Sequence, residues 1–249
     1  MDKDRKAKRT SCSECPLRSL ASFRDFTDRE LSFVEDFKTG ELVADPAATI
    51  LVEGAHSAHL YTVLSGWAFR YKTLVDGRRQ ILNFVMPGDL IGLQGALMEE
   101  MQHSVEALTP VRLCVFERGK ISKVYTQHPT LAFDITWMAA REERILDENL
   151  LSVGRRSAFE RAAYLLVYLY QRAQLAGVLN GGKAEIPITQ QHVADTLGLS
   201  TVHTNKTLRK LADRNLIKWR ERACDILDAE GLLNVSGWEG FEESSRPFI

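Results

Sequence analysis

The chain has 249 residues, of which 45% are hydrophobic and 26% are charged, and its formal net charge is −1. This length and composition fit a soluble protein with one large or two ordinary domains. No apolar run approaches the roughly 18 residues needed to cross a bilayer, and the basic start MDKDRKAKRT leads into no apolar signal-peptide segment. We therefore expect a cytoplasmic protein whose residues 1–26 form an N-terminal arm with a disordered beginning.

Short β-rich runs separated by glycines fill the first half of the chain. Gly54, Gly66, Gly77 and Gly88 recur at intervals of eleven or twelve residues. The runs cover 60–64, 67–71, 80–85, 103–108 and 111–116. Regularly spaced short strands predict a small antiparallel barrel or sandwich over residues 27–128.

A long helix is predicted for residues 129–153. It carries a partly apolar stripe at three- and four-residue spacing, made of Ile135, Met138, Ile145, Leu146 and Asn149. Such a stripe packs either on its own barrel or on a second copy of the chain. We favour a symmetric homodimer interface, because the DNA-binding motif that follows reads DNA best as a two-fold pair.

Residues 189–210, TQQHVADTLGLSTVHTNKTLRK, have the pattern of a helix-turn-helix. Thr189 and Ser200 are suited to cap the two helices, and Gly198 supplies the sharp turn. On the second helix Leu208 and Leu211 face inward. An ordinary helical hairpin with a solvated outer face is the alternative.

The outer face of the second helix predicts contacts with bases in the major groove. Its polar and cationic positions are Thr201, Val202, Asn205, Lys206 and Arg209. Other polar residues are expected to meet the phosphate backbone, namely Thr189, Gln190, Gln191, Ser200 and His203. Residues 155–222 contain twelve Lys and Arg against five Asp and Glu, a net charge of +7. Two short strands, 217–220 and 225–227, predict a wing and complete a winged helix-turn-helix domain at residues 154–238.

The order of strands, long helix and winged helix-turn-helix resembles the Crp/Fnr superfamily of bacterial transcription regulators, and the resemblance covers nearly the whole chain. Gly66, Gly77 and the segment 87–92 sit at the family's β-roll turns, and 157–163 (SAFERAA) resembles the start of its DNA-binding domain. The resemblance implies an α+β fold with an antiparallel β-roll like a cyclic-nucleotide-binding domain, a long dimerisation helix and a winged helix-turn-helix. Double-stranded DNA, a homodimer and RNA polymerase are the partners it implies. No catalytic constellation suggests an enzyme.

Cyclic nucleotide binding is not expected. Family members that bind cyclic AMP carry a Glu shortly after the glycine turn, whereas this chain reads Gly-Leu-Gln-Gly-Ala-Leu at 92–97. Their phosphate-binding Arg is replaced at His103-Ser104. An anion without a guanidinium loses a bidentate, charge-assisted contact.

The cysteines suggest another signal. Fnr-type members hold a [4Fe–4S] cluster with three N-terminal cysteines and a fourth on a late strand, and Cys12, Cys15 and Cys114 fall at three of these places. Ala21 stands at the remaining one. Glu14, Asp25 or an external ligand would have to complete a cluster. A thiol switch without metal is the second possibility, and cysteines without a sensing role are the third.

The side chains of the second helix of the helix-turn-helix predict features of the operator. Classical members carry Glu and Arg where this chain has Val202 and Lys206. Val202 suits a thymine methyl group, Asn205 an adenine, and Lys206 a guanine or a phosphate. We therefore expect a palindromic operator with a different half-site and half-site centres about 10 bp apart. A signal at the cysteines or in the roll would act through the helix around 139–153. The sequence assigns no role to the tail at residues 239–249.

Overall fold

The computed structural model describes residues 10–179, 185–241 and 245–249. The expected disordered start and Lys183, one of the cations counted above, lie outside the described residues. Contacts divide the chain into two compact units. The roll unit spans Met1–Ala68, Met86–Ala139 and Ser244–Ile249, and the helix-turn-helix unit spans Phe69–Val85 and Ala140–Glu243. None of the described helices is long and apolar enough to cross a membrane.

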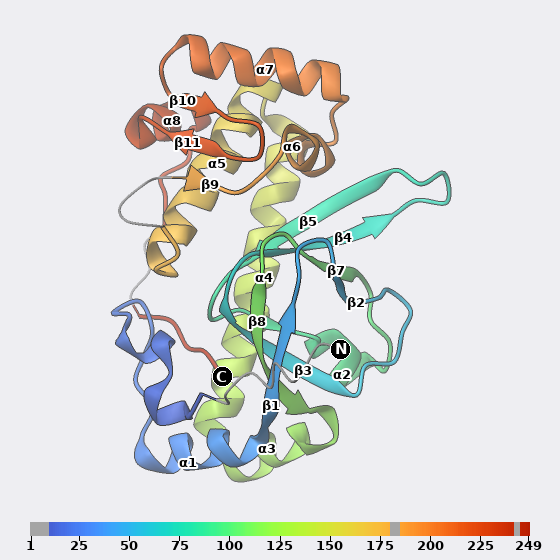
Figure 1. Ribbon diagram of the computed structural model, residues 1–249, viewed down its shortest axis with the longest axis vertical. Coiled ribbons are helices and arrows are strands. Elements are labelled where there is room, and N and C mark those ends of the chain that lie inside the picture. Colours follow the sequence, from blue (N-terminus) through green and yellow to red (C-terminus); the bar gives the residue numbers. More distant parts are fainter. Residues whose placement is uncertain (1–9, 180–184, 242–244) are drawn as a thin grey trace, which may run out of the picture. The chain divides into compact units, whose positions relative to one another are not determined.

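Antiparallel strands form the body of the roll unit (Figure 1). One sheet has the order β1-β8-β3-β6, and a second sheet includes the antiparallel pair of β2 and β7. The bounds are β1 Lys38–Ala44, β2 Thr49–Leu51, β3 His59–Ser65, β6 Leu90–Ile91, β7 Ser104–Ala107 and β8 Val111–Glu117. The expected antiparallel roll is confirmed. Strands β1, β2 and β6 had no counterpart in the sequence prediction.

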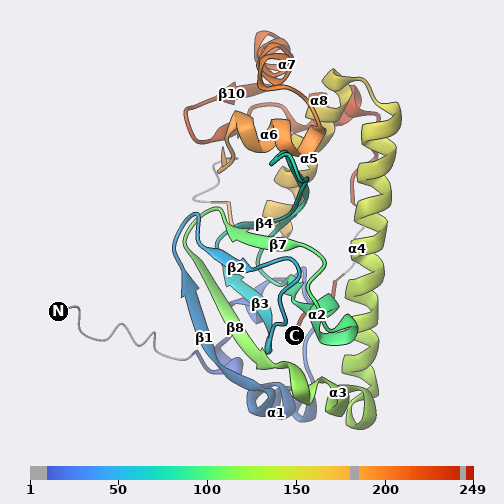
Figure 2. The ribbon, with the colours of Figure 1, turned by 90° about the vertical axis from the view of Figure 1, so that its right-hand side faces the viewer.

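Helices close the end of the sheet at which β1 begins and β8 ends (Figures 1 and 2). They are η1 Cys12–Glu14, η2 Pro16–Ser19, α1 Asp28–Phe37, η3 Arg118–Lys120, α3 Ile121–Gln127 and the start of α4 Pro129–Arg155, while α2 Leu93–Met98 follows β6. Thr27 and Glu30 form a capping box that begins α1. Leu17 and Phe23 belong to the same apolar core as Phe116 and Leu131. The described part of the arm, from residue 10 onward, is therefore an integral part of the roll unit.

The described part of the helix-turn-helix unit contains the end of α4, four further helices, a small sheet and a hairpin from the first half of the chain. Its elements are the hairpin of β4 Ala68–Thr73 and β5 Arg79–Val85, α5 Ala158–Leu175, β9 Glu185–Ile186, α6 Gln190–Leu197, α7 Thr201–Asp213, β10 Ile217–Trp219, β11 Cys224–Ile226 and α8 Ala229–Ser236. Strand β4 begins at Ala68, which is the last residue of the first segment of the roll unit. The small sheet has the order β10-β11-β9. The two predicted wing strands are present, and β9 adds a third that was not predicted.

The β4–β5 hairpin, which the sequence assigned to the roll, also packs on the helix-turn-helix. Arg79 forms an ion pair of 2.8 Å with Asp195 of α6. The Gln80 amide donates to the Thr196 carbonyl at 2.8 Å. The Arg172 guanidinium of α5, which is 3% exposed, donates to the Phe84 carbonyl at 2.7 Å. These are contacts between residues about 90 to 115 positions apart, which sequence periodicity cannot reveal.

The stripe predicted as the dimer interface needs correction. Ile135 and Met138 lie in the core of the roll unit, and Ile145 is 3% exposed. The Asn149 amide donates to the Leu82 carbonyl at 3.0 Å. Of the predicted set only Leu146 leaves much surface. Periodicity identified a buried face of α4, but that face packs within the chain. The large exposed apolar side chains of α4 are Phe133, Leu146, Leu150, Leu151 and Val153.

Candidate DNA-binding interface

Local hydrogen bonds fix both helices of the helix-turn-helix. The Thr189 hydroxyl accepts from the His192 amide at 3.2 Å, and the Thr189 amide donates to His192 Nδ1 at 3.1 Å. Burial, together with the Arg79 cation, lowers the pKa of His192. A neutral ring is what this cap requires, because its Nδ1 must accept a hydrogen bond.

The turn between the helices follows the predicted pattern. Gly198 ends α6 in the left-handed region with φ of 64°, which a residue with a Cβ adopts only at a cost. The Ser200 hydroxyl then accepts from the His203 amide at 3.3 Å and begins α7. The capping roles expected of Thr189 and Ser200 are therefore confirmed, and both hydroxyls already have a partner inside the motif.

Helix α7 has one buried and one exposed face. Thr204, Thr207, Leu208 and Leu211 are buried. The opposite positions are all exposed: Thr201, Val202, His203, Asn205, Lys206 and Arg209. Val202 leaves 66% of its surface in solvent. An exposed β-branched side chain among amide and cationic groups is suited to contact base edges, since thymine offers a methyl group there.

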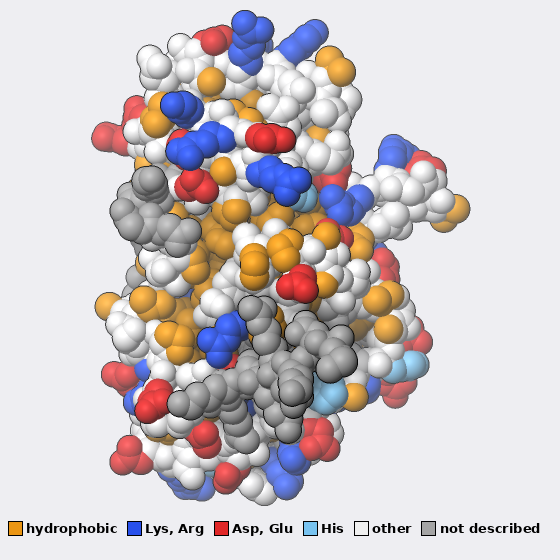
Figure 3. All heavy atoms as spheres, in the orientation of Figure 1, with side chains coloured by type: hydrophobic (Ala, Val, Ile, Leu, Met, Phe, Trp, Pro, Cys, Tyr) orange, Lys and Arg blue, Asp and Glu red, His pale blue; other side chains and the backbone are white. Residues whose placement is uncertain are grey.

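Cations surround the exposed face of α7. Lys206, Arg209, Lys210, Arg214, Lys218 and Arg222 are exposed on α7, after it and in the wing. Figure 3 shows Lys and Arg side chains projecting from the surface of this region. In the wing, Arg220 is held by Asp225 at 2.6 Å and by Glu185 at 3.4 Å. The cationic surface meets the main requirement for binding a phosphate backbone.

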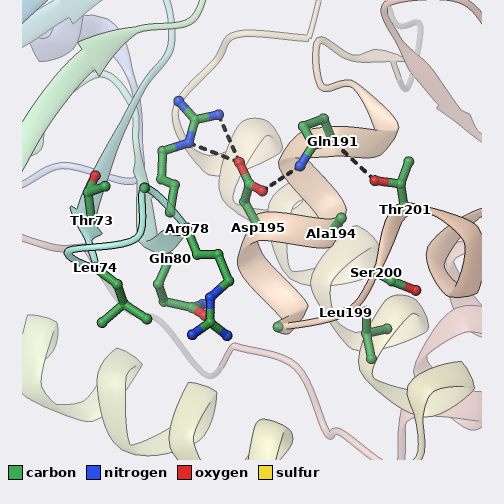
Figure 4. Close-up of a pocket in the computed structure, with 13 residues that line it drawn as sticks. Thr73, Leu74, Arg78, Gln80, Gln191, Ala194, Asp195, Leu199, Ser200 and Thr201 are labelled. Carbon is green, nitrogen blue, oxygen red and sulfur yellow. Dashed lines mark hydrogen bonds and ion pairs between the residues drawn. The ribbon is translucent and has the colours of Figure 1, made fainter.

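A cleft of about 890 Å³ separates the β4–β5 hairpin from the start of α7 (Figure 4). Gln191 lies on its wall, where its amide donates to Asp195 at 2.6 Å and its carbonyl oxygen accepts from the Thr201 hydroxyl at 3.2 Å. Asp195 in turn binds Arg79. The chain Arg79–Asp195–Gln191–Thr201 therefore connects the hairpin to the first residue of the predicted recognition helix. Gln190 is only half-buried at the start of α6.

The three cysteines singled out in the sequence meet around one small cavity of the roll unit. Cys12, Cys15 and Cys114 line a space of about 20 Å³ together with Phe248 and other apolar residues. Burial, with Glu35 nearby, raises the pKa of Cys12 to about 12, and burial raises the pKa of Cys114 to about 11. Burial also raises the pKa of Cys15. All three groups are therefore neutral thiols in this arrangement.

A [4Fe–4S] cluster does not fit this pocket. The space holds about one water molecule, and neither Glu14 nor Asp25, the carboxylates proposed as a fourth ligand, lines it. Within residues 10–179, 185–241 and 245–249, no three His, Cys, Asp or Glu side chains are arranged to hold a metal ion. The sequence correctly brought the three cysteines together, but the space between them is filled by apolar side chains.

Two family models match successive parts of this chain. The model of the cyclic nucleotide-binding domain matches residues 41–128, and that of the Crp-like helix-turn-helix domain matches residues 160–235. The nitrogen fixation regulation protein FixK of Bradyrhizobium diazoefficiens is 30% identical, over 87% of this chain and 90% of FixK. The transcriptional activatory protein AadR of Rhodopseudomonas palustris is 32% identical, over 69% and 71%. The structure of FixK2 from Bradyrhizobium japonicum superposes with a TM-score of 0.70 at 26% identity, covering 78% and 96%.

This chain belongs to the Crp/Fnr family. It is therefore a DNA-binding transcription regulator, and its relatives are regulators rather than enzymes. The predicted fold class is confirmed, with antiparallel sheets of the cyclic-nucleotide-binding type, long helices and a C-terminal helix-turn-helix.

The segment in which the Glu and Arg of cyclic-AMP-binding family members are missing is closely packed in this chain. A Cβ on Gly95 would lie 2.9 Å from the sulfur of Met101, which is 1% exposed. The Ser104 hydroxyl accepts from the Glu53 amide at 3.0 Å, and His103 is 5% exposed. The missing Glu and Arg already argue against a nucleotide phosphate at this place. The close packing of these side chains is a further reason.

Proposed function

We propose that this Crp/Fnr regulator binds a palindromic operator as a homodimer and reads each half-site with α7. The observation that carries the proposal is the division of α7 into a buried face and an exposed face of polar, cationic and β-branched side chains. Val202 is assigned to a thymine methyl group, Asn205 to an adenine and Lys206 to a guanine. The half-site centres should lie about 10 bp apart.

The homodimer is assigned to the exposed apolar positions of α4. Leu146, Leu150 and Val153 follow one another at helical spacing and are 40%, 73% and 42% exposed, and an exposed apolar helix face of this kind often meets a partner. A two-fold interface gives each recognition helix a symmetric counterpart. AadR is named a transcriptional activatory protein, and by analogy we assign RNA polymerase as a further partner and activation as the outcome.

Selection of bound sequences from a random DNA pool, followed by anisotropy titrations at several salt concentrations, tests this assignment. Lys206→Ala should weaken operator binding by about 1–3 kcal/mol, or roughly 5- to 150-fold, and relax the preference at one base pair. Lys123→Ala removes the same charge from an exposed position of α3 in the roll unit and should leave binding unchanged. Equal effects of the two substitutions would contradict the proposed docking of α7.

We assign the signal to thiol chemistry at Cys12, Cys15 and Cys114 rather than to an iron–sulfur cluster. The support is the convergence of three thiols on one cavity too small for eight further atoms. Protein purified without oxygen should contain no stoichiometric iron or sulfide and show no visible absorption band. A band near 400 nm that disappears in Cys114→Ser would replace this assignment by a cluster.

A further inference from the structure

The end of the described chain, Arg246–Ile249, lies inside the roll unit, although it follows the helix-turn-helix unit in sequence. Its backbone adds to the arm segment that precedes α1. The Arg24 amide donates to the Arg246 carbonyl at 2.9 Å, and the Arg246 amide donates to the Ser22 carbonyl at 2.8 Å. Phe23 and Arg246 thus form a parallel bridge. This segment is called the tail below.

The Arg246 side chain is bound like a ligand. It is 4% exposed, its Nη1 lies 3.1 Å from Asp89 Oδ1, and its Nη2 donates to the Pro87 carbonyl at 2.9 Å. Its guanidinium also lies over the Phe23 ring, 4.5 Å from the centroid. Replacing Arg246 by a side chain that lacks these contacts would leave its partners as unpaired polar groups in an apolar site, and that is costly.

The turn that receives Arg246 has no room for a larger residue. Gly88 has a φ of +85°, and a Cβ there would lie 2.3 Å from the Phe23 ring and 3.0 Å from Arg246 Nη2. This glycine turn, which resembles the β-roll turns of the family, forms one wall of the groove that holds the tail. The groove offers a carboxylate, a carbonyl, an aromatic face and a backbone edge.

The rest of the tail closes the cysteine cavity. Phe248 packs on Phe23 and Phe26 with ring centroids 5.1 and 4.8 Å apart, and the Thr62 hydroxyl donates to the Ile249 carbonyl. Phe248 and Ile249 are 3% and 4% exposed. Both line the cavity around the three thiols.

We propose that this groove is a peptide-binding site for an arginine–proline–aromatic–aliphatic sequence, that its ligand is the chain's own tail, and that release of the tail opens the thiols of Cys12, Cys15 and Cys114 to solutes. The backbone of the tail makes one pair of ladder hydrogen bonds, whereas β3 and β8 are paired along most of their length, so we expect the tail to open in a local step before those strands do. The inference does not depend on DNA binding.

Alkylation of the full chain by iodoacetamide, followed by mass spectrometry of each cysteine, tests the proposal. Arg246→Ala is the decisive variant, because Arg246 does not line the cavity and its loss makes no hole beside the thiols. We expect alkylation of Cys12, Cys15 and Cys114 to become about tenfold faster. Ser245→Ala, at the exposed neighbouring position, should leave the rates unchanged. Arg246→Lys keeps the charge but loses the fork and should be intermediate.

Cys224 provides the internal control, because it is buried in β11 of the other unit. Equal acceleration at Cys224 would indicate general loss of the fold and overturn the proposal, as would unchanged rates at the other three cysteines. An excess of the peptide Ser-Arg-Pro-Phe-Ile should restore protection in Arg246→Ala, and failure to do so would contradict a peptide-binding groove.

The unmodified chain offers a test that needs no substitution. Amide hydrogen exchange of Arg24 and Arg246 should be faster than that of Val63 and Leu113, which lie in the paired strands β3 and β8. Exchange at the rate of these strands would show that the tail opens only with the core and would overturn the proposal.

Discussion

The exposed face of α7 and the cysteine pocket differ in the solvent exposure of their side chains. Val202 on α7 is 66% exposed, whereas Cys12 and Cys114 are 7% and 6% exposed. A surface that reads DNA needs no rearrangement before binding, since its side chains already point outward. Buried neutral thiols react with nothing until something moves. The helix-turn-helix unit is therefore prepared for its ligand, and the roll unit is prepared for a conformational step.

The largest expected effect tests whether the two units behave as separate folding units. Leu211, on the buried face of α7, is 0% exposed. Leu211→Ala should destabilise the helix-turn-helix unit by about 2–5 kcal/mol through lost burial and a residual cavity. Hydrogen exchange should then accelerate in α5 to α8 and remain slow in β3 and β8. Leu113→Ala, at a position of β8 that is also 0% exposed, should give the opposite pattern. Acceleration throughout the chain in both variants would break the comparison.

Acid should loosen the roll unit selectively. Burial acts to raise the pKa of Glu41, but hydrogen bonds from Lys38, the Thr10 amide and Arg112 outweigh it and lower that pKa to about 2. A carboxylate with a lowered pKa stabilises the fold above its unfolded value near 4.5, and this stabilisation is lost as pH falls toward 2. The loss is on the order of 3 kcal/mol.

Glu41→Gln is the measurement that isolates this acid effect. The unfolding free energy of the variant should be lower than that of the unmodified chain at pH 7, and the gap should shrink steadily below pH 4.5. A gap that is independent of pH would assign the acid sensitivity to other carboxylates.

How far the sequence predicted each region follows from the separation of the residues involved. Thr189, Gly198 and Ser200 act on amides or carbonyls within four positions, so the turn and both caps of the helix-turn-helix could be predicted from sequence. Arg246 and Asp89 are 157 positions apart, and no local pattern pairs them. The stripe of Ile135 and Ile145 was recognised as apolar, but periodicity does not tell which surface covers it.

The placement of the cysteines came from a resemblance and not from physical reasoning on the residues. It correctly grouped Cys12, Cys15 and Cys114, yet it carried over a cluster for which the cavity has no room. The volume of the cysteine cavity depends on side chains from distant segments, here Phe248 and Ile249. No pattern in the sequence suggested their role.

A matched pair of glycines sharpens the contrast between a free turn and a receptor turn. Gly77 and Gly88 both have a φ of +85°, but a Cβ on Gly77 meets nothing within 4 Å. Either Gly→Ala change should cost about 1–2 kcal/mol for the left-handed backbone. Gly88→Ala should cost about 1–3 kcal/mol more, because Phe23 must move. Denaturant unfolding of the two variants measures the difference, and equal costs would mean that the tail and its groove adjust freely.

The smallest expected effect concerns the β4–β5 hairpin, which packs on the helix-turn-helix through Arg79 and Gln80. Arg79 and Asp195 are 25% and 12% exposed, so Arg79→Ala should cost about 1 kcal/mol, more than a surface pair but less than a fully buried one. Arg78, its exposed neighbour, pairs with Asp76 at the tip, and Arg78→Ala should cost almost nothing. Because Asp195 also holds Gln191 beside Thr201, losing Arg79 should loosen the start of α7 and speed amide exchange at His203. If exchange at His203 responds equally to both substitutions, the hairpin does not support the start of α7.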